Sequence, residues 1–303
     1  MSGRIQSFLA VILASPFSGS GSGPAFASAH GGLANYTVGD VWYPGYDPNS
    51  PLGPLQLTQQ QPGIPQRSYS SIDPIFSPTS PYLACNSPAL SPPNTPQHYI
   101  PLTPGQNLSA IYYFWLHPVG PMSVYLSEPC PIPPNSTLGD CSSVNLEEVK
   151  WFKIWESGLL TGPNLAEGTW YQKSFQNWVG DGENRWTVRI PGRVREGRYL
   201  VRHEILSLHV AGGPQWYVGC GHLDVRRGTI REGEGEGEGE GELPPGEYWV
   251  KFPGAYREDD PDIFIDIYSE ENANRTEYVV PGPRIWPGYV FLSNFSYSFL
   301  PLP

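Results

Sequence analysis

The sequence has no long apolar run and little positive charge. No stretch reaches the roughly 18 consecutive apolar residues of a membrane-spanning helix, so we expect no membrane span. Charged residues make up 16% of the 303 residues, only 18 are Lys or Arg, and the formal net charge is −11. Nucleic-acid binding depends on concentrated positive charge because phosphate contacts dominate its affinity. The sequence therefore predicts neither a membrane protein nor a nucleic-acid-binding protein.

Several catalytic and cofactor motifs are also absent. The chain contains no H-E-x-x-H zinc motif, G-x-S-x-G nucleophile turn, P-loop or dinucleotide fingerprint. Its four cysteines have no C-x-x-C spacing, which argues against a cysteine metal site. A glycosidase would need a pair of carboxylates, but nothing in the sequence singles out a pair. Hydrolysis is therefore a weak hypothesis for this chain.

What the sequence does contain favours an all-β fold. Pro and Gly account for 35 and 34 residues, so few windows of about 12 residues lack both, and long helices are disfavoured. Residues 44–104 are rich in Pro, Ser, Gln and Asn, which predicts long loops over a sheet. We expect an immunoglobulin-like or fibronectin-like β-sandwich with long loops. The predicted strands are 107–115, 122–127, 151–155, 186–190, 198–210, 215–225 and 263–268.

The first 29 residues have the pattern of a secretory signal. Arg4 precedes the apolar run 8–14, and a segment of small residues ends in Ala27-Ser28-Ala29. Cleavage after Ala29 leaves His30 as the first residue of a secreted, extracellular protein. We therefore expect a signal peptide at 1–29, one domain at 30–286, and a tail at 287–303 without a carbohydrate-binding module.

Cysteines and glycosylation sequons agree with export. Four cysteines in an oxidising compartment suggest two disulfides. The short loop between Cys130 and Cys141 could be closed locally, which leaves Cys85 with Cys220, but three pairings are open on sequence alone. Sequons for N-linked glycosylation occur at Asn35, Asn107, Asn135, Asn274 and Asn294.

A strict Glu-Gly alternation runs from Glu232 to Glu242 and contains six Glu. Glycine maximises chain entropy and like charges repel, so we expect a flexible, solvated insertion. A cation-binding tract is the alternative, and the Gly spacers weigh against it because they do not preorganise ligands.

A set of polar side chains dispersed along the chain carries the candidate chemistry. His117 precedes Gly120-Pro121, and His209 lies near the end of the predicted strand 198–210. Gln215 and Tyr217 are two residues apart on another predicted strand, so their side chains point to the same face. Taken alone, the pattern favours a core histidine at position 209, and Tyr217 could likewise be a core residue. His98 and His222 are expected at the surface.

These residues stand among motifs that occur in one order along the chain. The motifs are Thr79-Ser80-Pro81, Cys85-Asn86, Gly120-Pro121, Val124-Tyr125-Leu126, 151–154, 197–205, Leu208-His209, Gln215-Trp216-Tyr217, 252–256 and Pro281-Gly282-Pro283. In this order, behind a signal that exposes His30, the chain resembles the fungal lytic polysaccharide monooxygenases of auxiliary-activity family 9. The resemblance runs from His30 to about Trp286.

The resemblance implies a site for one copper ion. His30 would bind copper through its α-amine and Nδ1, His117 would supply a second imidazole nitrogen, and Tyr217 would lie axially. Nitrogen donors in a tetragonal arrangement suit Cu(II). His209 and Gln215 would be the catalytic residues that hydrogen-bond near the oxygen position.

The resemblance also implies a flat aromatic surface for the substrate. Tyr256 would stack on a sugar ring, and Tyr43 would extend that surface. The implied activity is oxidative cleavage of β-1,4-glucan, cellulose above all, at C1 or C4. Oxygen or hydrogen peroxide would be the cosubstrate, an external donor would supply electrons, and the protein would act as a monomer.

One departure from the family pattern bears on this prediction. The second copper histidine of the family commonly lies two residues before the Gly of Gly-Pro, where this chain has Pro118, and His117 comes one residue earlier. The alternative function is therefore a non-catalytic copper-binding or glucan-binding protein of the same fold.

Overall fold

The computed structural model describes residues 31–46, 63–69, 71–87, 97–112, 115–176, 184–227 and 241–288. The predicted signal segment 1–29, His30, the Glu-Gly run up to position 240, and the predicted tail from 289 lie outside the described residues. In the part of the chain that is described, no helix is long and apolar enough to cross a membrane.

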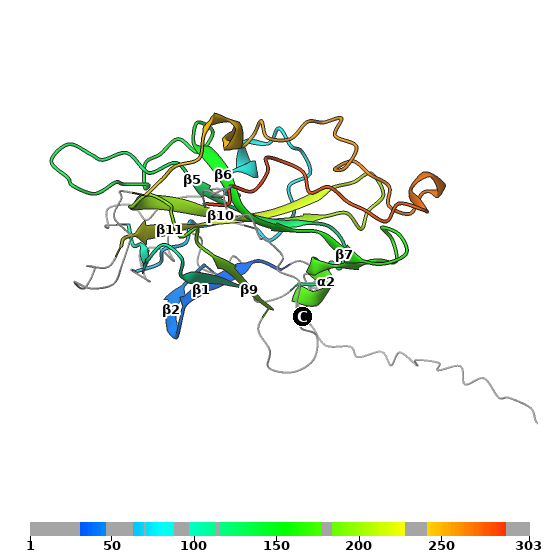
Figure 1. Cartoon of the computed structure of the whole chain (residues 1–303), viewed down its shortest axis with the longest axis horizontal. Coiled ribbons are helices and arrows are strands. Elements are labelled where there is room, and N and C mark those ends of the chain that lie inside the picture. Colours follow the sequence, from blue (N-terminus) through cyan, green and yellow to red (C-terminus); the bar gives the residue numbers. More distant parts are fainter. Residues whose placement is uncertain are drawn as a thin grey trace, which may run out of the picture.

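Two antiparallel sheets form a sandwich, as the sequence predicts (Figure 1). The four-stranded sheet has the order β2-β1-β4-β9 and the six-stranded sheet the order β12-β6-β5-β10-β11-β3, in which only the β11–β3 pair is parallel. A further hairpin pairs β7 with β8. The strands are β1 Leu33–Val38, β2 Val41–Pro44, β3 Ile100–Leu102, β4 Asn107–Tyr112, β5 Met122–Ser127, β6 Lys150–Ser157, β7 Leu159–Thr161, β8 Thr169–Trp170, β9 Asn184–Arg189, β10 Gly197–Ser207, β11 Gln215–Val225 and β12 Val250–Lys251.

Helices are few and short in the described residues. The α-helix α2 spans Tyr171–Phe175, and the 3-10 turns η1, η2 and η3 span Pro81–Leu83, Gly246–Tyr248 and Glu270–Asn272. This agrees with the high Pro and Gly content, which interrupts helices before they can propagate.

The six-stranded sheet is covered on both faces. Alternate residues of β10 and β11 enter a core between the two sheets, and the residues between them enter a second core under the loops. On β11, for example, Tyr217 belongs to the first core and Trp216 to the second. Figure 1 shows the four-stranded sheet on one side of the six-stranded sheet and the loops on the other.

Two disulfides cross-link the loop layer, which is the set of loops that covers the second core. Cys85 is bonded to Cys220 on β11, and Cys130 is bonded to Cys141. The first joins the segment around η1 to the six-stranded sheet across 135 residues, and the second closes a local loop. This is one of the three pairings that the sequence left open.

The predicted strand at 263–268 is wrong. The segment consists of turns and irregular chain, and the amide N–H groups of Ile263 and Phe264 both bond to the carbonyl of Asp260. The alternation nevertheless correctly identified the buried side, because Ile263, Ile265 and Ile267 all lie in the second core. A period of two indicates which side chains are buried, but a strand also needs a neighbouring strand to bond.

A buried ion pair supports the loop layer. Arg202 and Glu204 on β10 are almost fully buried, and Arg202 Nη2 lies 2.6 Å from Glu204 Oε2. The guanidinium also donates to the carbonyls of Leu83 and Ala84 and lies 3.7 Å from the ring centroid of Phe252. The pair therefore ties the sheet to two loops.

Neutralising this pair should destabilise the fold. In Glu204→Gln, the guanidinium of Arg202 loses its counter-charge in a buried environment, which costs about 3–5 kcal/mol of unfolding free energy. Urea unfolding measures the difference. The matched control is Asp259→Asn, which removes the carboxylate of an exposed pair with Arg257 and should leave stability nearly unchanged. Equal stabilities for Glu204→Gln and the wild type would contradict the prediction.

Candidate functional site

The candidate residues converge at one end of the six-stranded sheet. At this end β5 begins, β10 stops at Ser207, and β11 starts at Gln215, directly opposite Ser207. His117 lies in the loop before β5, His209 follows β10 by two residues, and Tyr217 is the third residue of β11. The loop before β5, the end of β10 and the start of β11 thus bring these side chains together, although the side chains are up to 100 residues apart in sequence.

Direct contacts join the side chains of four residues, which are His117, His209, Gln215 and Tyr217. The rings of His117 and His209 stack with centroids 4.2 Å apart. The hydroxyl of Tyr217 lies 3.0 Å from His117 Nε2 and donates to Gln215 Oε1 at 2.9 Å. Because a phenol has one proton, donation to Gln215 leaves the lone pairs of the Tyr217 oxygen directed at His117.

The loop that carries His117 is fixed by a glycine. Gly120 has φ +122°, and a Cβ there would lie 2.0 Å from the carbonyl oxygen of Leu206. Only glycine permits this approach, and it brings the loop into hydrogen-bonding range of β10: Leu206 N donates to Pro121 O and Leu208 N to Val119 O. The Gly-Pro motif therefore sets the path of the His117 loop against β10.

Two further residues position the cluster, and the sequence reasoning did not identify them. Trp115 Nε1 donates to the carbonyl of His117 at 2.9 Å, and its ring packs edge-on against Tyr217 with centroids 4.9 Å apart. Ser207 Oγ lies 2.9 Å from His209 Nδ1. Trp115 and Ser207 each lie two residues from a candidate histidine, and this spacing is the only sequence signal for them.

Burial keeps Tyr217 protonated. Loss of solvent, with a smaller contribution from the negative charge of Asp73, raises the pKa of the Tyr217 hydroxyl. A neutral phenol can donate to Gln215 and is a weak oxygen ligand through its lone pairs.

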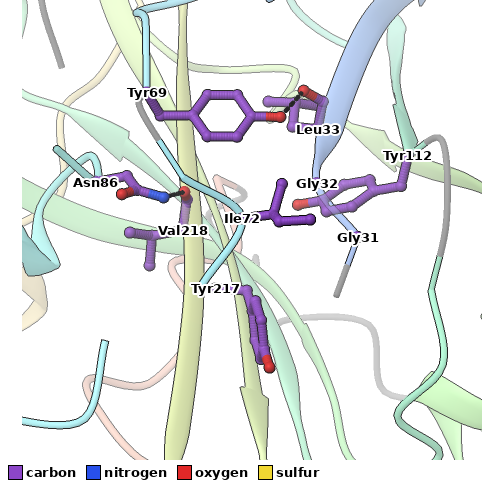
Figure 2. A pocket seen from close by; sticks show the side chains of 9 residues that line it. All are labelled: Gly31, Gly32, Leu33, Tyr69, Ile72, Asn86, Tyr112, Tyr217 and Val218. Carbon is purple, nitrogen blue, oxygen red and sulfur yellow. Dashed lines mark hydrogen bonds between the residues drawn. The ribbon is translucent and has the colours of Figure 1, made fainter. Parts of the chain in front are cut away.

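A pocket joins the start of the described chain to Tyr217 (Figure 2). Gly31 and Gly32, which directly follow His30 in the sequence, line it together with Ile72 and Tyr217. Across it, the hydroxyl of Tyr69 donates to the carbonyl of Leu33 at 2.9 Å. The N-terminal segment is therefore held beside the candidate cluster.

The donor set fits a copper ion. An imidazole nitrogen and a phenol oxygen 3.0 Å apart converge on one region, and imidazole is a preferred ligand of copper. Among the described residues there is no group of three or more His, Cys, Asp or Glu that could hold a metal. The predicted site needs only two histidines, and one of these, His30, lies outside the described residues. The earlier position of His117 in its loop does not keep it from the cluster.

Tyr256 does not lie on an exposed surface, contrary to the prediction. It is 4% exposed, its hydroxyl donates to Glu204 Oε1 at 2.5 Å, and it packs in the second core. The Phe-Pro-Gly-Ala-Tyr motif thus satisfies the buried carboxylate and does not present a ring to sugar. Tyr43 is half-buried on the edge strand β2 and packs against the first core. Substrate binding by Tyr43 stays a prediction.

His222 is also placed differently from the prediction. It is fully buried, and its Nδ1 lies 2.7 Å from the carbonyl oxygen of Pro65. The strand alternation of β11 directs it inward, where Arg67 lies 3.4 Å from its Nε2. His98 is exposed, as expected.

Comparison with known proteins identifies the family. Residues 30–278 match the sequence model of Auxiliary Activity family 9, formerly GH61. The chain is 35% identical over 262 residues to AA9 family lytic polysaccharide monooxygenase B of Heterobasidion irregulare, covering 86% of this chain and 93% of that protein. It is 32% identical to an AA9 lytic polysaccharide monooxygenase-like protein, CEL1, of Agaricus bisporus, covering 86% and 72% of the two chains.

Solved structures give the same result. The crystal structure of HiLPMO9B superposes with a TM-score of 0.69 at 34% identity, covering 85% of this chain and all of that chain. A cellulose-active polysaccharide monooxygenase from M. thermophila superposes with a TM-score of 0.67 at 28% identity, covering 85% and 99%. Fold and relatives together define a polysaccharide-cleaving monooxygenase. The chain belongs to auxiliary activity family 9, the lytic polysaccharide monooxygenases.

Proposed function

We propose that the protein is a secreted, copper-dependent monooxygenase that oxidises C1 or C4 of β-1,4-glucan, with cellulose as the main substrate. The observation that carries the proposal is the contact between His117 and Tyr217 beside His209 and Gln215. Support for the substrate comes from the solved relative described as cellulose-active. Oxygen or hydrogen peroxide would be the cosubstrate, and an external donor would supply electrons to a monomeric enzyme.

The proposed site can form only after residues 1–29 have been removed. This removal frees the α-amine of His30, which can bind a metal only when deprotonated. Gly31 and Gly32, the residues that follow His30, line the pocket beside Tyr217, which supports this assignment. Export is also consistent with the two disulfides and with exposed sequons at Asn107, Asn135 and Asn274.

The residues of the site would have distinct roles. His117, with the amine and ring of His30, would hold copper, and the hydroxyl of Tyr217 would contribute an oxygen beside them. Bound copper would supply the one-electron chemistry that activates the cosubstrate. Gln215 fixes the hydroxyl of Tyr217, and Ser207 anchors Nδ1 of His209. His209 would therefore donate or accept a proton through its other ring nitrogen.

The test is to characterise the secreted protein as processed. N-terminal mass spectrometry should find His30 as the first residue, and electron paramagnetic resonance should show one type-2 Cu(II) ion. With a reductant, the protein should release oxidised cello-oligosaccharides, and a chelator should stop the reaction. A correctly processed protein without the Cu(II) signal and without oxidised products would refute the proposal. Tight copper binding without such products would favour the non-catalytic alternative.

A further inference from the structure

Pro121 leaves a gap in the hydrogen-bond ladder beside the candidate site. The register of β10 against β5 pairs Ile205 with Met122, so the next pair along the two strands is Leu206 with Pro121. In a hydrogen-bonded antiparallel pair, each residue donates its N–H to the carbonyl of the other. Leu206 N donates to Pro121 O at 3.0 Å, but proline has no N–H to donate in return. The carbonyl of Leu206 therefore receives no backbone donor from this pair.

The side chain of Gln172 supplies the missing donor. Gln172 is the second residue of α2 and is fully buried, and its Nε2 donates to Leu206 O at 2.8 Å. The same amide nitrogen donates to Pro121 O at 3.4 Å. Gly120 leaves room for this amide, since a Cβ at position 120 would lie 2.9 Å from Gln172 Nε2. A side-chain amide thus takes the place of the backbone N–H that Pro121 lacks.

The burial of Gln172 indicates that its donor group is needed here. Among the described residues, no donor reaches its buried Oε1. An unpaired buried carbonyl costs free energy, so an apolar side chain of similar size would be favoured if packing alone decided. The bonds from Nε2 to two backbone carbonyls offset this cost. What Gln172 adds to the fold is therefore the closure of the ladder between Leu206 and Pro121.

This closure joins the two segments that carry the candidate histidines. Pro121 follows His117 by four residues in one segment, and Leu206 precedes His209 by three residues in the other. The rings of His117 and His209 stack with centroids 4.2 Å apart. Since Gln172 bonds to both segments, it holds the backbone positions from which these two rings meet.

The helix α2 contacts the His117 loop at a second point. Gln176, which follows the last residue of α2, donates from Nε2 to the carbonyl of Leu116, the residue before His117. The helix is itself fixed to the first core, where Phe175 packs edge-on against Tyr112 with centroids 5.4 Å apart. The core thus supports the loop through the polar side chains of α2.

We propose that Gln172 is a positioning residue of the candidate site. Its amide closes the ladder at Pro121 and thereby keeps the loop of His117 in register with the end of β10 that leads to His209. The inference rests on the proposed function, in which His117 is a copper ligand and His209 transfers a proton. Gln172 acts on both through the backbone that carries them, and orientation of a metal ligand by such a neighbour commonly raises metal affinity.

Gln172→Met tests the proposal, because methionine has a similar length and no donor. In the processed, metal-free protein, NMR should find the amides of Leu206 and Leu208 exchanging roughly fivefold to tenfold faster, the effect of losing about one hydrogen bond. The ring resonances of His117 should shift, since its stacking on His209 is disturbed. Isothermal titration should show copper affinity reduced about 10-fold to 100-fold.

Restoring the backbone donor gives a rescue specific to this proposal. Pro121→Ala returns an N–H that can bond to the carbonyl of Leu206, so Gln172→Met should have a much smaller effect in that background. The double variant should therefore recover amide exchange and copper affinity toward the wild type. It should also fold if Gln172→Met alone does not. A double variant as impaired as the single one would overturn the proposal.

The control is Gln97→Met. Gln97 Nε2 also donates to two backbone carbonyls, at 3.3 Å and 2.8 Å, but the residue precedes β3, which pairs with the end of β11 remote from Gln215. Its loss should leave the exchange of Leu206, the His117 resonances and copper affinity unchanged, whatever its effect on thermal stability.

The outcomes separate this proposal from the proposed function. If folded Gln172→Met keeps wild-type copper affinity and wild-type His117 resonances while the wild type binds copper, the positioning role fails and the function stands. This holds even if amide exchange is faster, because Gln172 would then be structural alone. If the wild type binds no copper, the copper function fails. A shift of the His117 resonances in Gln172→Met would then still support the positioning of that loop.

Discussion

Replacing His117 with alanine is expected to lower copper affinity by more than about 100-fold and to abolish oxidised products. Loss of even an outer-shell partner typically costs 10–100-fold in metal affinity, and His117 is proposed to be a direct ligand. Tyr217 would keep its hydrogen bond to Gln215 but lose the imidazole at 3.0 Å. Isothermal titration with Cu(II) measures the affinity, and the Cu(II) resonance spectrum reports the change in nitrogen ligands.

Two comparisons make this result specific. His98→Ala removes an exposed histidine and should leave copper affinity unchanged. Thermal unfolding of His117→Ala without metal separates ligand loss from misfolding, because Trp115 and Gly120 hold the loop through contacts that involve its backbone. Wild-type copper affinity in a folded His117→Ala protein would show that another residue is the ligand.

Acid should destabilise the protein through two buried histidines. Burial lowers the pKa of His203 to about 3 and that of His222 to about 3, with the positive charge of Arg67 adding to the effect at His222. In the unfolded chain each pKa is about 6.5. Below that pH the unfolded state binds two protons that the native state excludes until about pH 3, so unfolding becomes progressively more favourable.

The expected profile has a defined window. Stability from these groups is complete above about pH 6.5 and is lost as the pH falls toward 3, by up to about 1.4 kcal/mol per pH unit for each histidine. His203 faces the hydroxyl of Tyr36 and the ring edge of Trp186, whereas Arg67, Asp140 and Arg198 surround His222. Urea unfolding between pH 4 and 8 gives the slope.

A variant assigns the slope to one residue. Among the described residues, no hydrogen-bond partner reaches Nε2 of His203, so the one hydrogen bond that His203→Leu removes is the weak 3.4 Å contact with Tyr36. Its stability should depend less on pH by about 1.4 kcal/mol per unit, whatever its absolute stability. His98→Gln, at an exposed site, should keep the wild-type slope. An unaltered slope in His203→Leu would mean that the carboxylates alone cause acid unfolding.

Local patterns were sufficient for much of the fold and of the site. Short apolar segments between turn signals located β5, β6, β9, β10 and β11 within a few residues of their observed bounds. The strand period of two placed Gln215 and Tyr217 on one face, and their hydroxyl–amide contact confirms it. Ordered motifs then identified the family before any contact was known.

Burial contradicted the interpretation of two residues, Tyr256 and His222. Tyr256 follows Pro-Gly in a loop, a position typical of surface residues, yet it is required to satisfy the buried Glu204. His222 has no local partner in sequence; its neighbours Pro65 and Arg67 come from a segment about 155 residues earlier. Such contacts depend on long-range packing, which a short window does not contain.

By itself, the sequence determined the β-sandwich class, the family, and the candidates His117, His209, Gln215 and Tyr217, because strand periodicity and motif order are local properties. Only the tertiary structure decided the disulfide pairing and the burial of Tyr256 and His222. It also decided that a histidine displaced by one residue still reaches Tyr217. The reason is that Gly120 lets the loop approach β10 closely, and that approach is a contact between segments about 86 residues apart.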